Sequence, residues 1–309
     1  MLSFLPPLLR GIIASLILII NTLVLAPLLI CVSLLRFVLP IKTVQIRCTI
    51  IAIGIAELWI SVNSGWMWLT QKMQWDVQGI ETLDKQHWYL VTSNHQSWSD
   101  IVILQHLLNR KIPMLKFFLK QQLIWVPVIG LCWWALDFPF MKRFSKEYLA
   151  KHPEKRGLDF ASTQKACEKF KYTPVAVFNF LEGTRFTQDK YDSQQSPYKY
   201  LLKPKAGGMG FVLGAMGDNM NSLLDVTIFY PNQQRPTFWD FVSGNVNNVI
   251  VQAQEKPIPA EFLGKNYSED ETFRYEFQAW VSDLWQAKDD KMAELHQQSI
   301  DKGWSKPID

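Results

Sequence analysis

The sequence predicts an α/β fold, in which a mixed sheet is flanked by helices and preceded by an N-terminal membrane anchor. Two observations lead to this prediction. The first seventy residues hold two long apolar runs, and from about residue 75 onward short segments rich in Val, Ile, Phe and Tyr alternate with stretches of helical period. We therefore expect residues 1–70 to form the anchor and residues 71–309 to form one domain. The clearest strands are expected at 88–91, 175–181, 226–230 and 249–252.

The composition favours a membrane-associated protein. Charged residues make up 19% of the 309 residues, below the roughly 25% of ordinary soluble domains, and there are 13 tryptophans. The net charge of +4 is small and no run of five like charges occurs, so the basic footprint of a nucleic-acid-binding protein is absent from the sequence. The four cysteines form no CxxC pair and have no histidine cluster beside them, so we interpret them as reduced structural residues.

The first apolar run, residues 11–35, is long enough to span a bilayer, which takes about 20 residues. It carries no charge and is flanked by Arg10 and Arg36. A cleaved signal peptide is disfavoured, because no basic residue precedes Arg10 and the run exceeds the roughly 7 to 15 residues of such segments. Pro27 leaves two possibilities open: a kink within one helix, or the tip of a re-entrant hairpin.

The second apolar run, residues 50–69, fits two arrangements. It contains Glu57 and three tryptophans, a composition typical of the membrane interface. It either spans the bilayer or forms an amphipathic helix packed on the domain. Basic residues are more numerous after the first run than before it, which by the positive-inside rule places the domain in the cytoplasm unless the second run also spans. Those basic residues are Arg36, Lys42 and Arg47, against Arg10 alone.

The C-terminal segment predicts an amphipathic helix. Ser268 and Glu271 have the spacing of a capping box at its start. Apolar residues then recur on one face, and we expect that face to pack against the core of the domain rather than against a membrane or a partner. The residues of this face are Phe273, Phe277, Trp280, Val281, Leu284 and Trp285.

A histidine and an aspartate five residues apart follow the strand expected at 88–91. Loops at the carboxyl ends of strands are where α/β proteins build their sites. If this loop curls back, the Asp100 carboxylate accepts a hydrogen bond from one imidazole nitrogen of His95, and the other nitrogen can take a proton from a substrate hydroxyl. Alone, the pair also fits a plain structural reading in which Asp100 caps the following helix.

Ser97 and Ser99 keep open a hydrolase with a serine nucleophile. That alternative is disfavoured, because a serine two residues from its base is poorly placed for the hydrogen bond and no GxSxG elbow occurs in the sequence. A non-catalytic lipid-binding membrane protein is a third alternative, which would not need the pair of His95 and Asp100.

Two further segments carry residues suited to binding a phosphate. Glu182, Gly183, Thr184 and Arg185 follow the strand expected at 175–181, where the glycine permits a sharp turn and the arginine offers a planar fork of donors. Upstream, Arg143 ends an apolar run and is a candidate for the other half of an anion site. Taken singly, each segment is also explained as a turn with an exposed ion pair or as a solvated strand end.

In their order along the chain, these motifs resemble those of the lysophosphatidic acid acyltransferases (1-acylglycerol-3-phosphate acyltransferases) of the glycerolipid acyltransferase superfamily. The resemblance covers roughly residues 75 to 235, and four motifs in the family's order are far more specific than any one of them. The matching residues are His95 and Asp100 in HxxxxD; Lys120, Leu123, Pro127 and Gly130 in KxxLxxxPxxG; Arg143 in the second block; and Glu182, Gly183, Thr184 and Arg185 in EGTR.

The chain also departs from the family's usual pattern. Leu181 stands where proline usually precedes EGTR, and Asp137 stands where glycine usually lies six positions before the arginine of the second block. Other features look more like the branch that includes the lysocardiolipin acyltransferases, which leaves the acceptor and the preferred acyl chain open. They are Phe186 and Thr187 after EGTR, and Lys142 before Arg143.

The resemblance implies an enzyme that moves a fatty acyl group from acyl-CoA or acyl carrier protein to a lysophospholipid, most directly 1-acylglycerol-3-phosphate, which gives phosphatidic acid. It implies no metal, no organic cofactor and no nucleic-acid partner. The expected location is a membrane, the bacterial inner membrane, with the catalytic domain facing the cytoplasm. The implied roles are base for His95, orientation of its ring for Asp100, phosphate binding for Arg143 and Arg185, orientation of the arginines for Glu182, and substrate binding for Gly183 and Thr184.

Overall fold

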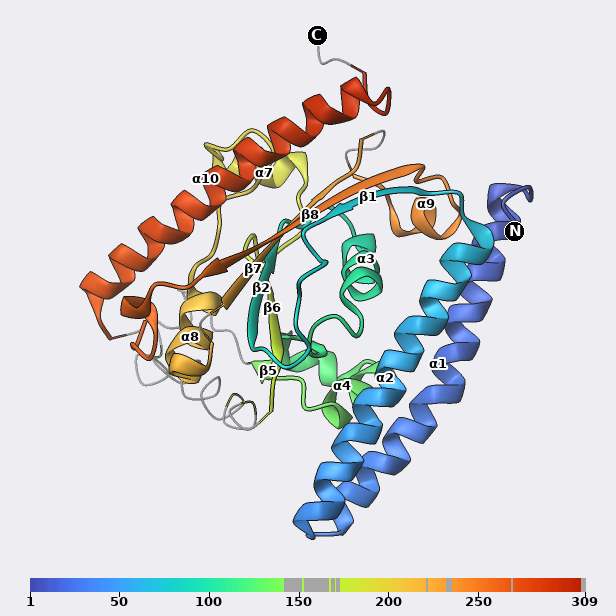
Figure 1. Ribbon diagram of the computed structural model, residues 1–309, viewed down its shortest axis with the longest axis vertical. Coiled ribbons are helices and arrows are strands. Elements are labelled where there is room, and N and C mark those ends of the chain that lie inside the picture. Colours follow the sequence, from blue (N-terminus) through green and yellow to red (C-terminus); the bar gives the residue numbers. More distant parts are fainter. Residues whose placement is uncertain are drawn as a thin grey trace.

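A six-stranded mixed sheet forms the centre of the structure, in the order β1-β8-β7-β2-β6-β3 (Figure 1). The computed structural model describes residues 1–141, 152, 167, 170, 173–220, 222–231, 235–267 and 269–306. Neighbouring strands in this sheet are parallel except for β7 and β8. The strands are β1 (Gln74–Gln78), β2 (Tyr89–Ser93), β3 (Leu115–Phe117), β6 (Ala176–Phe180), β7 (Ser222–Phe229) and β8 (Asn248–Pro257). A separate parallel pair joins β4 (Leu119–Lys120) to β5 (Phe140–Met141).

The central strands β2 and β7 are buried along their whole length. A strand that is covered on both faces carries a continuous apolar run, which is why the sequence revealed these two. Successive side chains point to opposite faces, so Leu90 joins one apolar cluster while Tyr89 and Val91 join the other. The predicted mixed sheet with helices on both sides is confirmed.

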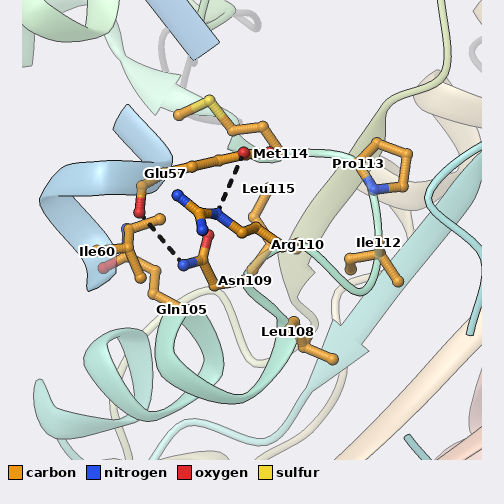
Figure 2. A pocket seen from close by; sticks show the side chains of 10 residues that line it. All are labelled: Glu57, Ile60, Gln105, Leu108, Asn109, Arg110, Ile112, Pro113, Met114 and Leu115. Atoms are coloured by element: carbon orange, nitrogen blue, oxygen red, sulfur yellow. Dashed lines mark hydrogen bonds and ion pairs between the residues drawn. The ribbon is translucent and has the colours of Figure 1, made fainter. Parts of the chain in front are cut away.

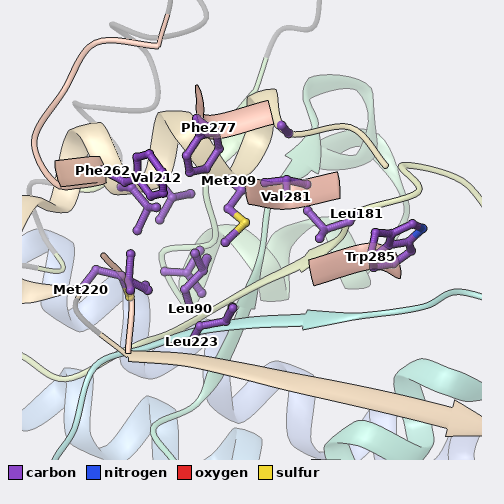
Figure 3. Packing of buried hydrophobic residues seen from close by; sticks show 14 of the residues in the cluster. Leu90, Leu181, Met209, Val212, Met220, Leu223, Phe262, Phe277, Val281 and Trp285 are labelled. Atoms are coloured by element: carbon purple, nitrogen blue, oxygen red, sulfur yellow. The ribbon is translucent and has the colours of Figure 1, made fainter. Parts of the chain in front are cut away.

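One face of the sheet is covered by α8 (Gly207–Met216) and α10 (Glu271–Asp301). Figure 3 shows side chains from both helices packed against Leu90 and Leu223 of the sheet. The predicted packing of the C-terminal helix on the core is confirmed, since Phe273, Phe277, Val281 and Trp285 recur every four residues and are fully buried. Trp280 and Leu284 are partly buried against the same cluster.

The start of α10 differs from the prediction. Asp270 is its N-cap, and the Asp270 side chain accepts a hydrogen bond of 2.9 Å from the backbone N–H of Phe273. The helix is therefore capped by Asp270 and not by Ser268, which lies outside the described residues.

The opposite face is covered by α3 (Ser99–Leu108), by α9 (Phe238–Val242) and by one end of a long helical hairpin. Trp66 of the hairpin packs edge-on against Phe241 of α9, with ring centroids 5.7 Å apart. In the part of the chain that the structure describes, the other helices are α4 (Ile129–Ala135), α7 (Gln188–Gln194) and the short 3-10 turns η1 (Gln121–Trp125), η4 (Gly217–Asn219) and η5 (Ala260–Phe262).

The hairpin consists of α1 (Pro7–Val38) and α2 (Lys42–Thr70), which run side by side along the edge of the domain (Figure 1). Both helices are long and apolar enough to cross a membrane, by length and composition alone. Pro27 lies inside α1, so the alternative that it marks the tip of a re-entrant hairpin is wrong. The second run packs along α1 and contacts α3 of the domain.

Polar side chains within the hairpin bond to each other. The Asn21 amide donates to the Asn63 side chain over 3.0 Å and to the Trp59 carbonyl over 2.9 Å, and the Trp59 indole donates to the Thr22 hydroxyl over 2.9 Å. Interhelical hydrogen bonds of this kind favour one alignment of two apolar helices over others. Trp59 and Asn63 of the second run thus have structural partners in α1.

The hairpin is attached to the domain near both ends of α1. At one end the Arg10 guanidinium donates to the Gly244 carbonyl over 3.4 Å, and Gly11 lies so close to Trp239 that a Cβ there would come within 2.7 Å of its ring. At the other end Arg36 forms a 2.6 Å ion pair with Asp137, just beyond α4. The hairpin therefore lies along the domain instead of projecting from it.

A small cavity lies where α2 meets the end of α3 (Figure 2). Glu57 reaches across this junction and contacts Arg110 over 3.6 Å, while its backbone carbonyl accepts a hydrogen bond from Asn109. Lys85 also pairs with the Glu57 carboxylate, at 2.6 Å. The cavity has a volume of about 20 Å³, which holds about one water molecule. It is therefore too small for a lipid, and its lining residues serve as contacts between the hairpin and the domain.

Candidate active site

The two strongest motifs meet because their strands are parallel neighbours. Ser93 at the end of β2 pairs with Phe180 at the end of β6, so the loops that follow both strands leave the sheet at the same edge. The backbone N–H of Phe186 donates to the His95 carbonyl over 2.8 Å, which joins the two loops directly. The HxxxxD and EGTR segments, 87 residues apart between His95 and Glu182, thus form one site.

His95 and Asp100 are in hydrogen-bond contact. The imidazole Nδ1 lies 2.9 Å from Asp100 Oδ2, and the ring stacks on Phe180 with centroids 3.7 Å apart. Asp100 is completely buried, and the same oxygen accepts the backbone N–H groups of Gln96 and Ser97 over 2.7 and 2.9 Å. Since α3 begins one residue before Asp100 and its N-cap makes no side-chain bond, the carboxylate orders the preceding loop and is not the helix cap.

Tyr230 is a third member of this site that sequence reasoning missed. Its hydroxyl donates to the second carboxylate oxygen of Asp100, Oδ1, over 2.6 Å. Burial raises the pKa of Tyr230 well above its usual value, and the neighbouring Asp100 charge raises it further, so the hydroxyl stays protonated and remains a donor. The available signal was its position directly after β7, whose carboxyl end is next to that of β2.

Glu182 contacts the backbone of the HxxxxD loop and is almost fully buried. Its carboxylate accepts the backbone N–H of His95 over 2.7 Å and that of Leu202 over 3.1 Å. Burial raises the pKa of Glu182 to about 8, although these two backbone bonds act in the opposite direction. In the described residues both hydrogen bonds of Glu182 hold loop backbone, and its orientation of the arginines stays a prediction.

Gly183 and Thr184 shape the turn between Glu182 and Arg185. Gly183 has a φ of 66°, and a Cβ there would come within 3.0 Å of the Lys205 side chain, so glycine suits both the conformation and the space. The Thr184 hydroxyl accepts a hydrogen bond from the Lys190 ammonium over 2.7 Å. Arg185, at the end of this turn, is exposed.

Arg185 lines an open cleft of about 430 Å³ beside the HxxxxD loop. Its guanidinium lies 4.7 Å above the ring of Trp98. Gln96 and Ser97 of the HxxxxD loop line the same cleft, as does Arg235, which the sequence interpretation did not single out. Arg143, the other predicted phosphate ligand, lies outside the described residues.

Ser97 has a structural role in the loop. It is buried, and its hydroxyl donates to the Pro236 carbonyl over 2.6 Å and accepts the backbone N–H of Ser99 over 3.1 Å. A hydroxyl whose proton is committed to a carbonyl is poorly prepared to act as a nucleophile. This geometry disfavours the hydrolase alternative.

The KxxLxxxPxxG segment forms η1 and the start of α4. Gly130 lies against the Ile124 carbonyl, where a Cβ would come within 2.2 Å of the oxygen. Glycine is therefore required at this position for the segment to fold back on itself.

Comparison with known proteins identifies relatives among the acyltransferases. A family model for acyltransferases matches residues 74–229. The 1-acyl-sn-glycerol-3-phosphate acyltransferase 3 of Arabidopsis thaliana is 26% identical over 201 residues, which cover 60% of this chain and 50% of the relative. The lysocardiolipin acyltransferase 1 of Gallus gallus is 23% identical over 221 residues, covering 67% of this chain and 54% of the relative.

Among solved structures, the chain is similar to the 1-acyl-sn-glycerophosphate acyltransferase of Thermotoga maritima, with a TM-score of 0.47 and 17% identity over 89% of this chain and 97% of that one. The chain spans about half the length of the curated relatives it matches. The family model covers half of the chain and contains both motifs of the site. The chain therefore belongs to the acyltransferase family.

Proposed function

We propose that the protein transfers a fatty acyl group from a thioester donor, acyl-CoA or acyl carrier protein, to the hydroxyl of a lysophospholipid. The most direct acceptor is 1-acylglycerol-3-phosphate, with phosphatidic acid as the product. The observation that carries this proposal is the contact of His95 Nδ1 with the buried Asp100 carboxylate over 2.9 Å. The described residues leave the other ring nitrogen, Nε2, without a hydrogen-bond partner.

In the proposed reaction, His95 Nε2 removes the proton of the acceptor hydroxyl while its oxygen attacks the thioester carbonyl. Asp100 fixes the orientation of the ring and stabilises the imidazolium that forms. The tetrahedral intermediate then expels the thiolate of the donor, which takes the proton from His95. The ester and the free thiol are the products, and the histidine returns to its starting state.

Arg185 is proposed to bind the phosphate of the acceptor, together with Arg143. A guanidinium binds phosphate through two parallel hydrogen bonds, which an ammonium cannot do. Gly183 and Thr184 are proposed to belong to the same substrate-binding turn, and Glu182 supports it from below. The relatives named above include an enzyme named for lysocardiolipin, so an acceptor with a larger headgroup is the second candidate.

We also propose that residues 1–70 bind the membrane and that residues 71–309 are the catalytic unit. The outward faces of the hairpin support this, because they present large apolar side chains to the surroundings. In α1 these exposed residues include Leu16, Ile19, Ile20, Leu23, Val24 and Leu28. The location proposed is the bacterial inner membrane, with the catalytic unit facing the cytoplasm, where both thioester donors occur.

The experiment that tests the function is mass spectrometry of products formed by the purified full-length protein. The protein in detergent is given acyl-CoA or acyl carrier protein thioester and a panel of lysophospholipids. A diacyl product with wild type and none with His95→Ala is expected. Equal product from both proteins would contradict the proposed mechanism, and release of free fatty acid without acyl transfer would support the hydrolase instead.

A further inference from the structure

We infer that Arg235 is a further guanidinium that binds the same phosphate group as Arg185. This inference rests on the proposed function, in which Arg185 binds the acceptor's phosphate. Arg235 comes from the loop between β7 and α9, 50 positions after Arg185 in the numbering, and both residues line the same cleft. The ligand class is an organic phosphate whose terminal group carries two negative charges.

Both guanidiniums lie over aromatic rings at the mouth of the cleft. Arg235 lies 3.7 Å above the centroid of the Phe186 ring, and Arg185 lies 4.7 Å above that of Trp98. Phe186 is the residue directly after Arg185, so the ring that supports one arginine is fixed in the chain next to the other. Stacking holds the plane of a guanidinium while its N–H groups, which lie at the rim of that plane, stay available to a ligand.

The loop that carries Arg235 is attached to the catalytic loop. Ser97, two residues after His95, donates its hydroxyl proton to the carbonyl of Pro236 over 2.6 Å. On the other side, Thr237 caps α9 and forms a capping box with Asp240. Pro236 and Thr237, which follow Arg235, are thus held by the Ser97 hydroxyl and by the start of α9. These contacts fix the position of the Arg235 backbone relative to His95.

The cleft contains positive charge without a compensating carboxylate in its described lining. Besides the two arginines, the lining consists of neutral residues: Gln96, Ser97, Trp98, Phe186, Thr187, Gln188, Pro236, Thr237 and Phe238. Within the described part of the chain, neither guanidinium donates a hydrogen bond to a protein group, and neither forms an ion pair. Two like charges at one cleft repel each other, and an anion bound between them removes that repulsion.

The side chain of Gln96 adds a polar group to the same lining. Its Oε1 atom is buried and has no hydrogen-bond partner among the described residues. A buried acceptor left without a partner is unfavourable, so a ligand that brings a donor is favoured there. A glycerol phosphate headgroup carries both groups that this lining would bind. Its phosphate would contact the two arginines, and its hydroxyl would donate to Gln96.

The experiment is a double-mutant cycle on the full-length protein, with R185Q, R235Q and the double variant. Glutamine keeps a polar side chain but removes the charge and the fork. KM for 1-acylglycerol-3-phosphate is expected to rise about tenfold or more in each single variant, and the double variant should be little worse than either, because both residues bind one phosphate. The kcat at saturating acceptor is expected to change less than about twofold. R274Q, which removes a guanidinium on α10, is the matched control and should behave as wild type.

Three acceptor and donor comparisons locate the phosphate. R235Q should change KM little for monoacylglycerol, which has no phosphate. It should raise KM less for a lysophospholipid with a phosphodiester than for one with a phosphomonoester. Two results would overturn the inference, since each would place Arg235 at a different phosphate. One is a KM for the acceptor in the double variant that rises by the product of the two single increases. The other is an effect of R235Q on KM for acyl-CoA alone. R235K should recover only part of the loss, and an unchanged thermal midpoint of R235Q excludes simple misfolding.

A binding measurement separates this inference from the proposed function. Equilibrium binding of 1-acylglycerol-3-phosphate is measured in the H95A background, where turnover is not needed. Weaker binding by H95A/R235Q than by H95A supports the phosphate site even if no protein shows transferase activity. Equal binding by the two proteins overturns the inference, whether or not the wild type turns over.

Discussion

The hydroxyl of Tyr230 donates to Oδ1 of Asp100 over 2.6 Å, on the side of the carboxylate that His95 does not use. The other oxygen of Asp100 accepts three bonds, from the His95 ring and from the backbone N–H groups of Gln96 and Ser97. Four donors from two parts of the chain thus fix one buried carboxylate. A carboxylate held this firmly presents the imidazole in one orientation.

Tyr230→Phe is expected to lower kcat by roughly tenfold to a hundredfold and to leave KM for both substrates nearly unchanged. The substitution removes one hydrogen bond to a charged group, worth about 1.5 to 3 kcal/mol, without emptying the space that the ring fills. Steady-state kinetics of acyl transfer checks this. A change in KM with unaltered kcat would mean that Tyr230 acts on binding and not on the position of Asp100.

His95→Ala and Asp100→Asn are each expected to abolish acyl transfer, with losses on the order of a hundredfold to ten-thousandfold. An asparagine in place of Asp100 has one accepting oxygen. Its amide N–H₂ would therefore face a group that now donates to the carboxylate, and that hydrogen bond would be lost. Ser97→Ala should retain transfer, because the serine hydroxyl bonds to Pro236 and not to the substrate. Activity in the histidine variant together with its loss in the serine variant would rule out this mechanism.

The stability of the protein should depend on pH through Glu182. Burial raises the pKa of this carboxyl from 4.5 to about 8 in the folded state. Between these two pH values the folded state holds a proton that the unfolded chain releases. The contribution of Glu182 to the free energy of unfolding is therefore fully present below a pH of about 4.5 and is lost as the pH rises toward about 8. Glu182→Gln cannot titrate. The difference in thermal midpoint, wild type minus variant, is expected to fall across this window, and a constant difference would contradict the raised pKa.

Arg185→Lys keeps the charge but loses the planar fork of donors. It is expected to raise KM for the lysophospholipid about tenfold to a hundredfold, with a smaller effect on KM for the acyl donor. Monoacylglycerol should be a poor acceptor for wild type and should respond little to the substitution. Equal losses for both acceptors would indicate a structural role for Arg185.

The charge distribution around α1 predicts that the C-terminus lies in the cytoplasm. A reporter that is active only in the cytoplasm, fused after residue 309, should give signal, and a reporter active only outside should not. Signal from the outside reporter would require α2 to span the bilayer.

The sequence predicted the strands that are buried and missed those that are short or exposed. β2 and β7 carry apolar runs because helices cover both faces of the sheet there, and the first three residues of β6 and the first four of β8 are buried as well. β1 lies at the edge of the sheet and contains mostly polar, partly exposed residues, so it has no apolar signal. β3, β4 and β5 have only two or three residues each, and their pairing with neighbours defines them more than their own composition does.

In the site, contacts within one loop could be predicted from the sequence, and contacts that depend on the order of the strands could not. His95 and Asp100 are five positions apart, so their contact could be predicted from one loop. Tyr230 reaches Asp100 from 130 positions away, and only the order of the strands in the sheet brings them together. Glu182 shows the reverse difficulty: its motif was recognised, but the pairing of β2 with β6 directs its carboxylate to the His95 backbone.

The attachment of the hairpin along the domain has a practical consequence for truncation. Trp66 and Met67 of α2 are buried in the same apolar cluster as Val91 and Phe178 of the sheet, and the Gln71 side chain donates to the Phe241 carbonyl over 2.5 Å. A chain that starts at residue 71 would leave this cluster open to water on one side. Such a shortened protein is expected to aggregate, so soluble expression would have to come from substitutions of the exposed apolar side chains of α1 and α2 and not from deletion of the helices.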